Sequence, residues 1–200
     1  MTSRKSPLWA LAVVFFLLSL AVGWWGFRRP HVYADPFTAA RDADPPTIDY
    51  HLSRGLDPNV RDERGRTLLE LLATRHVDER RAGDIEYGAA RLLLEAGADP
   101  NAESNGTRPL HAACVHVKAR MIQLMLKHGA DPNLRDGHGR TALMNLGRNG
   151  IATINVAQNL VNAGADVSAV APDGYTALKH AEQMGARDFV AFLRARGAVE

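Results

Sequence analysis

The stretch Gly97-Ala-Asp-Pro-Asn101 recurs along the sequence and decides how the rest of the chain is interpreted. Variants of it begin at Gly55, Gly129 and Gly164, and a remnant, Gly197-Ala198, stands beside the C-terminal residues. The intervals between successive glycines are 42, 32, 35 and 33 residues. A regular period in the range of roughly 20–50 residues indicates an array of repeated structural units.

A second phrase recurs in phase with the first. It begins with a glycine and has a leucine four places on, and its copies are Gly65-Arg-Thr-Leu-Leu-Glu70, Gly106-Thr-Arg-Pro-Leu-His111, Gly139-Arg-Thr-Ala-Leu-Met144 and Gly174-Tyr-Thr-Ala-Leu-Lys179. Its intervals are 41, 33 and 35 residues. Two phrases that hold one register predict four units of the same structure.

Each unit is expected to contain two helices. A threonine hydroxyl can cap the first helix by accepting a hydrogen bond from a backbone N–H, and Glu70 completes a capping box in the first unit. These threonines are Thr67, Thr141 and Thr176. Arg108 takes their place in the second unit, which predicts an N-cap weaker by ~1 kcal/mol.

The second helix of each unit ends at a glycine placed to adopt the left-handed conformation. These glycines are Gly97, Gly129, Gly164 and Gly197. The first helix carries small and apolar residues, for example Leu143 and Leu146 in the third unit. No unit could bury its apolar face alone, so stacking of units must supply the core.

These phrases resemble the ankyrin repeat family, whose pattern D-x-x-G-x-T-P-L-H-x-A-A and ending L-L-x-x-G-A-D-x-N match about residues 46–200. The resemblance implies an all-α repeat solenoid of stacked helix–turn–helix units with hairpin loops. Only His111 keeps the family's histidine, and Glu70, Met144 and Lys179 stand in its place elsewhere. The expected divisions are a tail at 1–7, a transmembrane helix at 8–27, a linker at 28–36, a degenerate capping half-repeat at 37–60, and repeats at 61–101, 102–134, 135–169 and 170–200, the last being the C-terminal cap.

The first unit is longer than the others. Gly65 to Gly97 spans 32 residues, whereas Gly106 to Gly129 spans 23. The excess falls at 76–88, between the two expected helices. An ordinary surface loop is favoured there over a dedicated binding element.

The N-terminal residues predict a membrane segment. Residues 8–27 contain no charge, and at about 1.5 Å per helical residue they match the roughly 30 Å thickness of the hydrocarbon layer. All three tryptophans lie in this segment, and the pairs Arg4/Lys5 and Arg28/Arg29 flank it. A signal anchor is favoured over a signal peptide cleaved near Ser19-Leu20-Ala21. The near balance of flanking charge slightly favours a cytoplasmic tail and an exported repeat domain, which for a bacterium means the periplasmic side of the inner membrane. Cleavage would instead give a secreted or periplasmic protein.

Composition and motifs give little support to catalysis. Outside residues 1–29 the chain holds 20 basic and 22 acidic side chains, so the overall charge of +2 does not indicate nucleic-acid binding. The single cysteine, Cys114, rules out an internal disulfide and a cysteine zinc site, and an inert buried thiol is expected. His111 and His116 are five residues apart and face different directions on a helix. The sequence therefore predicts no enzyme, no cofactor, no metal site and no small-molecule substrate.

Two turn assignments follow from local sequence. Asn105-Gly106-Thr107 has the form of an N-glycosylation acceptor, but Asn-Gly is also the strongest two-residue hairpin signal, and the turn is favoured. The recurring residues Asp99, Asp131 and Asp166 are expected to bond their own backbone in turns. They would lie a full repeat apart, too far to form a catalytic pair.

The family generally binds other proteins on a concave face made of hairpin tips and first helices. Carried onto this chain, the partner-binding candidates are Arg64, Arg66, Glu70, His138, Arg140, Arg148, Asp173, Tyr175 and Lys179. Their arginines and histidine suggest a mildly basic groove for an acidic protein partner. The leading hypothesis is a membrane-tethered protein-binding module. The narrower alternative is an exported bacterial envelope protein that neutralises a toxin or supports an envelope enzyme.

Overall fold

The computed structural model describes residues 33–75, 79–146 and 151–199 of the chain, and Tyr33–Glu200 form one compact unit. Regular structure in these ranges is helical, and the β-type pairing found there is limited to the isolated bridges Arg61–Thr67 and Ser104–Thr107. This confirms the all-α class. None of the helices in these ranges has the length and apolar character needed to cross a bilayer. The predicted transmembrane segment 8–27 lies outside them.

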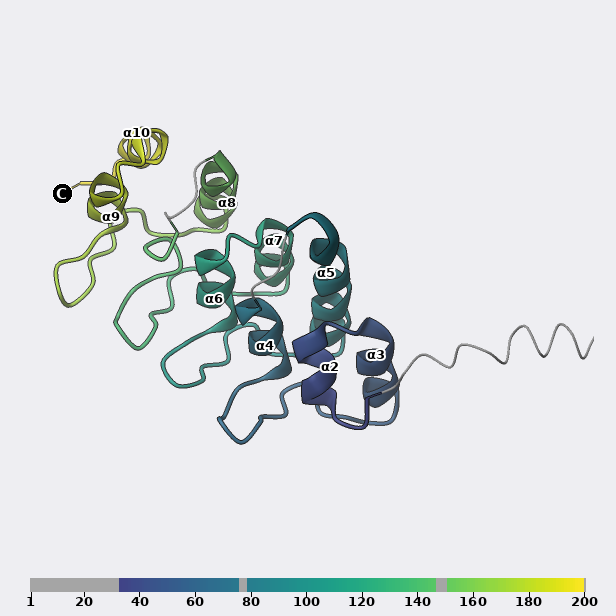
Figure 1. The fold of residues 1–200 in the computed structure, drawn as a ribbon. Coiled ribbons are helices and arrows are strands. Elements are labelled where there is room, and N and C mark those ends of the chain that lie inside the picture. The colour runs from purple at the N-terminus through teal and green to yellow at the C-terminus, as the bar shows by residue number, and fades with distance from the viewer. Residues whose placement is uncertain (1–32, 76–78, 147–150, 200) are drawn as a thin grey trace, which may run out of the picture. The chain divides into compact units, whose positions relative to one another are not determined.

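The helices form two layers, and hairpin loops line the free side of one of them (Figure 1). The inner helices, next to the hairpins, are α2 (Pro36–Asp42), α4 (Leu68–Thr74), α6 (Pro109–Val115) and α9 (Ala177–Gln183). The outer helices are α3 (Pro45–Ser53), α5 (Glu79–Glu95), α7 (Ala119–Lys127), α8 (Ile151–Asn162) and α10 (Arg187–Ala195). Inner helices α2, α4 and α6 pack in sequence, as do outer helices α3, α5, α7, α8 and α10.

The core runs between the layers as one continuous cluster. Leucine, isoleucine and methionine fill it from the outer helices, among them Leu93, Ile122 and Met125, which are fully buried. Alanines such as Ala73 and Ala113 are equally buried on the inner helices and allow these helices to approach closely. Each unit thus completes the core of its neighbour, as expected for stacked repeats.

Capping follows the threonine prediction in two units of three. Thr67 Oγ1 accepts from Glu70 N at 3.2 Å, and Thr176 Oγ1 accepts from Lys179 N at 3.0 Å. Arg108 makes no capping bond, as predicted. Its guanidinium instead donates to the carbonyls of Asn101 (2.5 Å) and Arg135 (3.1 Å), contacts that the sequence did not reveal.

The third unit departs from the prediction at its first helix. Residues 141–146 form a turn closed by bonds between residues three apart, such as Met144 N to Thr141 O at 3.1 Å. Thr141 Oγ1 has no hydrogen-bond partner in the described part of the chain. Asn145 and Gly147 have poor helix propensity, which accounts for the short turn. Leu143 and Leu146 are still fully buried, so the turn keeps their place in the core.

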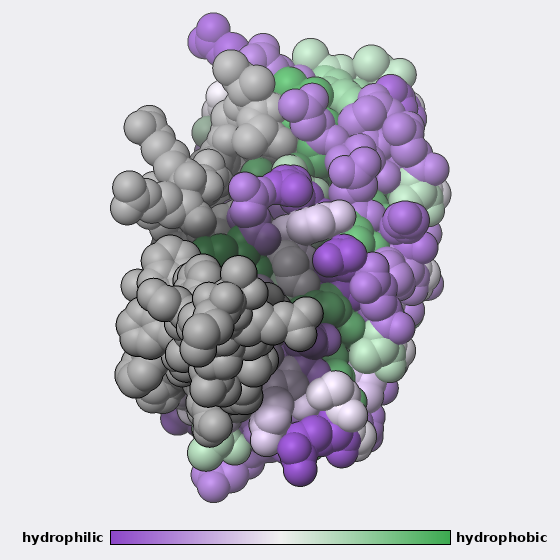
Figure 2. All heavy atoms as spheres, turned by 90° about the vertical axis from the view of Figure 1, so that its right-hand side faces the viewer, coloured by the Kyte–Doolittle hydropathy of each residue, from purple (hydrophilic) through white to green (hydrophobic). Residues whose placement is uncertain are grey.

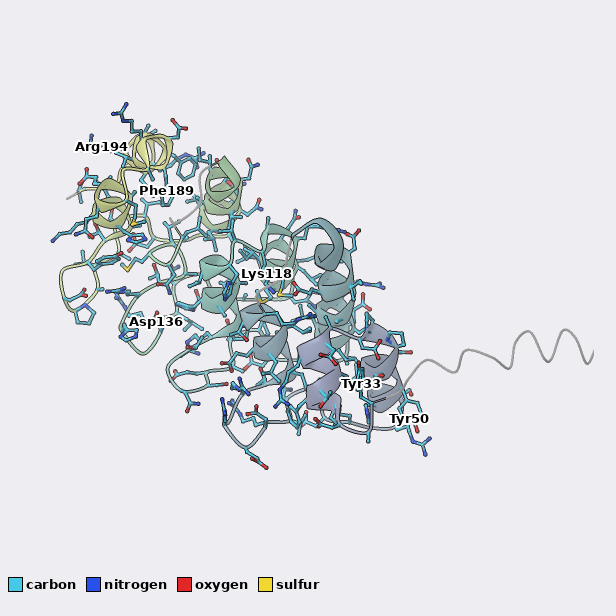
Figure 3. The ribbon with its side chains drawn as sticks, in the orientation of Figure 1. Tyr33, Tyr50, Lys118, Asp136, Phe189 and Arg194 are labelled. Atoms are coloured by element: carbon cyan, nitrogen blue, oxygen red, sulfur yellow. The ribbon has the colours of Figure 1, made fainter. Side chains whose placement is uncertain are left out.

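The described part of the insertion, residues 79–88, does not form the expected surface loop, and residues 76–78 lie outside the described ranges. Residues 79–88 belong to α5, which has 17 residues where α7 and α10 have nine. Glu86, near the middle of α5, is buried and binds Lys118 Nζ at 2.8 Å. Lys118 also donates to Leu72 O at 2.8 Å, and Figure 3 places it between the two helix layers. The insertion therefore lengthens an outer helix and ties it to the second unit.

The recurring phrase Gly-Ala-Asp-Pro-Asn joins consecutive units. In the first copy Asn59 donates to Gly97 O at 3.1 Å and accepts from Asp99 N at 2.7 Å. Asn101 and Asn133 repeat both bonds with the next unit. The aspartates bond the backbone two residues on, which confirms the predicted turns. The glycines that follow the outer helices adopt positive φ, also as predicted.

Candidate functional site

The four hairpins, closed at residues 62–66, 104–107, 136–140 and 171–175, are bonded to one another along the stack; we call them the hairpin row. Between the first two, Asn105 Nδ2 donates to Arg64 O at 2.7 Å and Arg61 donates to Glu103 O at 2.8 Å. Asn105-Gly106 forms the predicted turn, with φ of 49° and 78°. Arg135 reaches the fourth hairpin through Val170 O at 3.0 Å.

The second and third hairpins approach most closely at two glycines. Gly137 N donates to Gly106 O at 2.6 Å. A Cβ on Gly137 would lie 2.9 Å from Gly106 Cα, so no side chain fits there without displacement of the backbone. The turn motif predicted a role for Gly106, but the need for glycine at 137 arises only from this contact.

The first and third hairpins are each organised around an aspartate. Asp62 Oδ1 accepts from the amides of Arg64 and Arg66, both at 2.9 Å, and Asp136 Oδ1 accepts from those of His138 and Arg140 at the same distance. Burial alone would raise the pKa of the Asp62 carboxyl, but the bonds from Arg66 and Arg64 outweigh it and hold the pKa below its usual value. Asp62 therefore stays charged near neutral pH.

Two of the predicted binding arginines are engaged within the row. Arg66 forms a two-pronged ion pair with Asp62, with Nε and Nη2 at 3.0 and 2.8 Å from Oδ2. Arg140 Nη2 lies 3.3 Å from Asp173 Oδ2, and its guanidinium lies over the Tyr175 ring at 4.2 Å. Three candidates, Arg140, Asp173 and Tyr175, thus contact one another across the third and fourth hairpins.

The other candidates divide by exposure. Arg64, His138 and Lys179 are exposed, and among the described residues no carboxylate forms an ion pair with any of them. Glu70 is only 4% exposed, and burial raises the pKa of its carboxyl despite a hydrogen bond with Ser104. A partner at the surface cannot reach Glu70. Arg148 lies outside the described residues.

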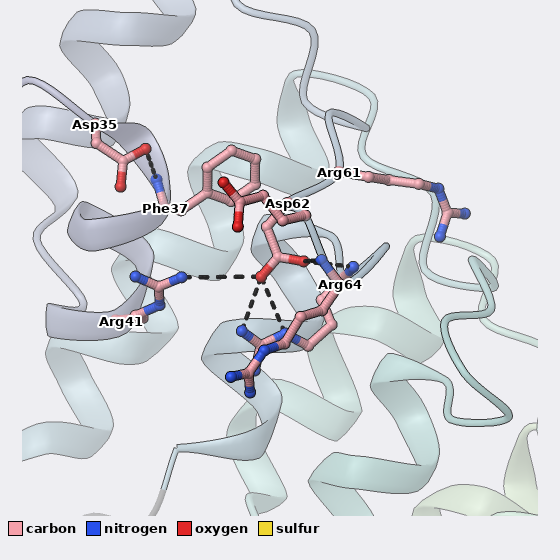
Figure 4. A pocket seen from close by; sticks show the side chains of 8 residues that line it. Asp35, Phe37, Arg41, Arg61, Asp62 and Arg64 are labelled. Atoms are coloured by element: carbon pink, nitrogen blue, oxygen red, sulfur yellow. Dashed lines mark hydrogen bonds and ion pairs between the residues drawn. The ribbon is translucent and has the colours of Figure 1, made fainter.

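A pocket of about 830 Å³ opens where α2 faces the first hairpin (Figure 4). Its lining residues are Asp35, Phe37, Arg41, Arg61, Asp62, Glu63, Arg64 and Arg66. From the sequence, Phe37 and Arg41 are expected only to belong to the capping half-repeat 37–60. Only the packing of α2 against α4 brings them beside a hairpin.

The outer surface carries both polar and apolar side chains. Figure 2, which faces the side that lies to the right in Figure 1, shows mostly hydrophilic residues with hydrophobic ones between them. Large apolar side chains that are exposed in the described ranges are scattered, for example Tyr50 on α3 and Ile85 on α5. Such isolated residues do not form a patch that needs covering.

Comparison with known proteins agrees with this geometry. The family model for ankyrin repeats (many copies) matches residues 93–144. Ankyrin repeat and SOCS box protein 16 of Mus musculus is 35% identical over 97 residues, which are 48% of this chain and 21% of that protein. Ankyrin repeat and LEM domain-containing protein 1 homolog of Caenorhabditis elegans is 54% identical over 55 residues, 27% of this chain and 8% of that protein. Neurogenic locus notch homolog protein 1 of Mus musculus is 34% identical over 142 residues, 70% of this chain and 5% of that protein.

The chain belongs to the ankyrin repeat family. It spans about a fifth or less of the length of these relatives. Ankyrin repeats are protein–protein interaction modules, and their family members are typically adaptors without enzymatic activity. For this ankyrin-repeat chain, the hairpin row and inner helices are therefore the candidate functional site.

The buried polar groups of the ankyrin core serve the fold. His111 Nε2 lies 3.0 Å from Arg140 O, which joins the second unit to the third hairpin. Burial raises the pKa of the Cys114 thiol, so the thiolate needed for nucleophilic chemistry is disfavoured. In the described ranges no group of three or more histidine, cysteine, aspartate or glutamate residues could hold a metal ion.

Proposed function

We propose that this ankyrin-repeat domain binds a partner protein along the hairpin row and the adjacent inner helices. The observation that carries the proposal is the bonding of all four hairpins to one another, while Arg64, His138 and Lys179 remain exposed. A surface that is already ordered loses little conformational entropy on binding. The row is therefore suited to bind a partner without first being rearranged.

The partner we propose is acidic. Arg66 and Arg140 are paired with carboxylates, so the basic character depends on the exposed side chains of Arg64 and Lys179. Exposed cations of this kind increase association rates and select against basic partners more than they add to affinity. Salt should accordingly slow association with the partner.

We propose further that residues 8–27 tether the domain to a membrane, with the repeats on the periplasmic side of a bacterial inner membrane. The support is the uncharged 20-residue segment flanked by arginine and lysine pairs. We propose no catalytic role, no nucleic-acid partner and no small-molecule substrate. No described residue favours the narrower envelope-protection role over general partner binding.

The test is recovery of partners by the full chain from cells that naturally produce it, after chemical cross-linking. The binding variant carries Arg64→Ser, His138→Ser and Lys179→Ser. The matched control carries Arg91→Ser, Lys127→Ser and Arg187→Ser, which remove three basic side chains from exposed positions on outer helices. Recovery should fall by about tenfold for the binding variant alone, with melting temperatures unchanged. Equal recovery by both variants would show that the hairpin row is not the binding surface.

A further inference from the structure

The pocket between α2 and the first hairpin is the place where the hairpin row meets the capping helices. Four arginines and three carboxylates line it, so its formal charge is +1. Arg64 connects the pocket to the rest of the row, because its carbonyl accepts from Asn105 in the second hairpin. A partner lying along the row would reach this pocket at the α2 end.

Two of the three carboxylates are already engaged. Asp35 caps α2 by accepting from Phe37 N at 3.1 Å and Thr38 N at 2.9 Å. Asp62 accepts from two backbone amides and from Arg66, and Arg41 Nη2 lies 3.8 Å from its Oδ2 (Figure 4). These internal bonds fix the two acids in the walls of the pocket. Glu63, the third, is exposed.

The arginines differ in what they can offer a ligand. Arg61 bonds Gly65 O and Glu103 O, and in Figure 4 it points away from the other labelled side chains. Arg66 is held by Asp62. Arg41 is half-exposed, with a long contact to Asp62, and Arg64 has no ion pair among the described residues. Arg41 and Arg64 are therefore the residues whose guanidinium groups can donate hydrogen bonds to a ligand's carboxylate.

Phe37 gives the pocket an apolar wall. It is partly buried and packs against the core, so its position is fixed. The guanidinium groups of Arg41 and Arg64 and the ring of Phe37 line the same pocket. Charge-assisted hydrogen bonds from arginine orient a carboxylate, and an aromatic ring covers apolar surface. The pocket therefore fits a carboxylate side chain that has an apolar neighbour.

We propose that this pocket binds an acidic side chain of the partner between Arg41 and Arg64, with an adjacent apolar side chain on Phe37. The proposal rests on the proposed function and names the point where the partner's acidic residue binds. Glu63 opposes that residue by like-charge repulsion, so its neutralisation should strengthen binding.

The test is fluorescence anisotropy with the full chain in a mild detergent at low ionic strength. The probe is a labelled dodecapeptide of four Leu-Glu-Gly units, and its control has glutamine in place of glutamate. Arg41→Gln and Phe37→Ser should each raise the Kd of the acidic probe about fivefold or more, whereas Glu63→Gln should lower it about twofold. Lys127→Gln removes a charge from an outer helix and should change nothing.

The proposal is overturned if Arg41→Gln and Glu63→Gln behave like Lys127→Gln, or if the glutamine probe binds as well as the glutamate probe. Either result leaves the proposed function intact if the variant with Arg64→Ser, His138→Ser and Lys179→Ser still recovers less of the partner. Loss of probe binding in Arg41→Gln, with no effect of this triple variant on partner recovery, would instead reject the hairpin row as the partner's surface. Because the triple variant also removes the Arg64 side chain, that result would show an acid-binding pocket that the partner does not use, and it would overturn the proposal as well.

Discussion

His111 shows how one buried residue couples the stack to pH. Its side chain is 2% exposed, and its Nε2 lies 3.0 Å from Arg140 O in the next unit. Burial lowers the pKa of the imidazole below 6.5, against the raising effects of Arg140 O and Asp136. The folded protein thus keeps His111 neutral at pH values where the unfolded chain binds a proton.

The free energy of unfolding should therefore fall as the pH drops below about 6.5, because the unfolded state takes up the proton first. The loss continues until the pH reaches the lowered folded pKa. Urea unfolding at pH 7.5, 6.5 and 5.5 measures it. His111→Gln keeps an N–H donor for Arg140 O and should reduce the slope between pH 7.5 and 5.5. A slope unchanged by His111→Gln would mean that another group is responsible.

Gly137 tests the tight contact within the hairpin row. Gly137→Ala places a Cβ 2.9 Å from Gly106 Cα, so we expect a loss of about 1–3 kcal/mol in unfolding free energy. Gly88→Ala is the matched control, because Gly88 lies in α5 and its Cβ would meet Pro45 Cγ at an ordinary 3.8 Å. That control should stabilise by about 0.5–1 kcal/mol. Equal effects of the two substitutions, measured by thermal unfolding, would remove the argument for a tight contact.

The roles of single residues were predictable where their hydrogen-bond partners lie nearby in the sequence. The Asp99 turn and the Thr67 cap depend on atoms two or three residues away, so their pattern is visible in the sequence. The partner of Arg108, Arg135 O, lies 27 residues along the chain, and that of Asn105, Arg64 O, lies 41 residues back. Only the stacking of units brings these groups together.

Among the elements, α5 departs most from its equivalents. Its extra turns place Glu86 against Lys118, with side-chain exposures of 7% and 12%. Burial lowers the pKa of the Lys118 ammonium, and Glu86 counteracts this effect. Arg75 Nε lies 3.7 Å from the other Glu86 oxygen. The lengthened helix is thus joined to the second unit by a buried ion pair.

Removing the carboxylate of this ion pair should lower the free energy of unfolding. Glu86→Gln leaves a buried ammonium without its carboxylate, and we expect a loss of roughly 3 kcal/mol in unfolding free energy. Asp84, also on α5, forms an exposed ion pair with Arg120 of α7, and 84% of the Asp84 side chain is exposed. Asp84→Asn removes this pair and should cost less than about 0.5 kcal/mol. Urea unfolding compares the two. If Glu86→Gln is as mild as Asp84→Asn, the ion pair does not anchor α5.

The helices were predictable to different degrees. The inner helices α4, α6 and α9 begin directly after Thr67, Arg108 and Thr176, as the phrase indicates. The third unit has the same threonine, but residues 141–146 form only a turn, because Asn145 and Gly147 have poor helix propensity. The α5 extension looked like a loop because its segment is strongly charged, and the burial of Glu86 in it depends on Lys118 from another unit.

At the scale of the whole molecule, the recurring asparagine of one unit forms two hydrogen bonds with the next unit. The last interface between units has fewer of these bonds. Ser168 takes the asparagine position there and makes one bond, from Oγ to Gly197 O at 3.3 Å. Ser168→Asn should restore both bonds and raise the free energy of unfolding by about 1 kcal/mol. Ser168→Ala is the control and should lower it slightly. If Ser168→Asn does not raise the free energy of unfolding in urea, the asparagine hydrogen bonds between units do not stabilise the stack.

The central claim, that the hairpin row binds the partner, is tested most directly by site-specific photo-cross-linking in cells that make the full chain. A benzophenone amino acid replaces Glu63 or Tyr175 in the row, or Arg91 or Gln123 on the outer helices α5 and α7. Mass spectrometry then identifies each adduct. The account predicts one shared partner protein at positions 63 and 175 and none at 91 and 123. A partner cross-linked from the outer helices alone would contradict it.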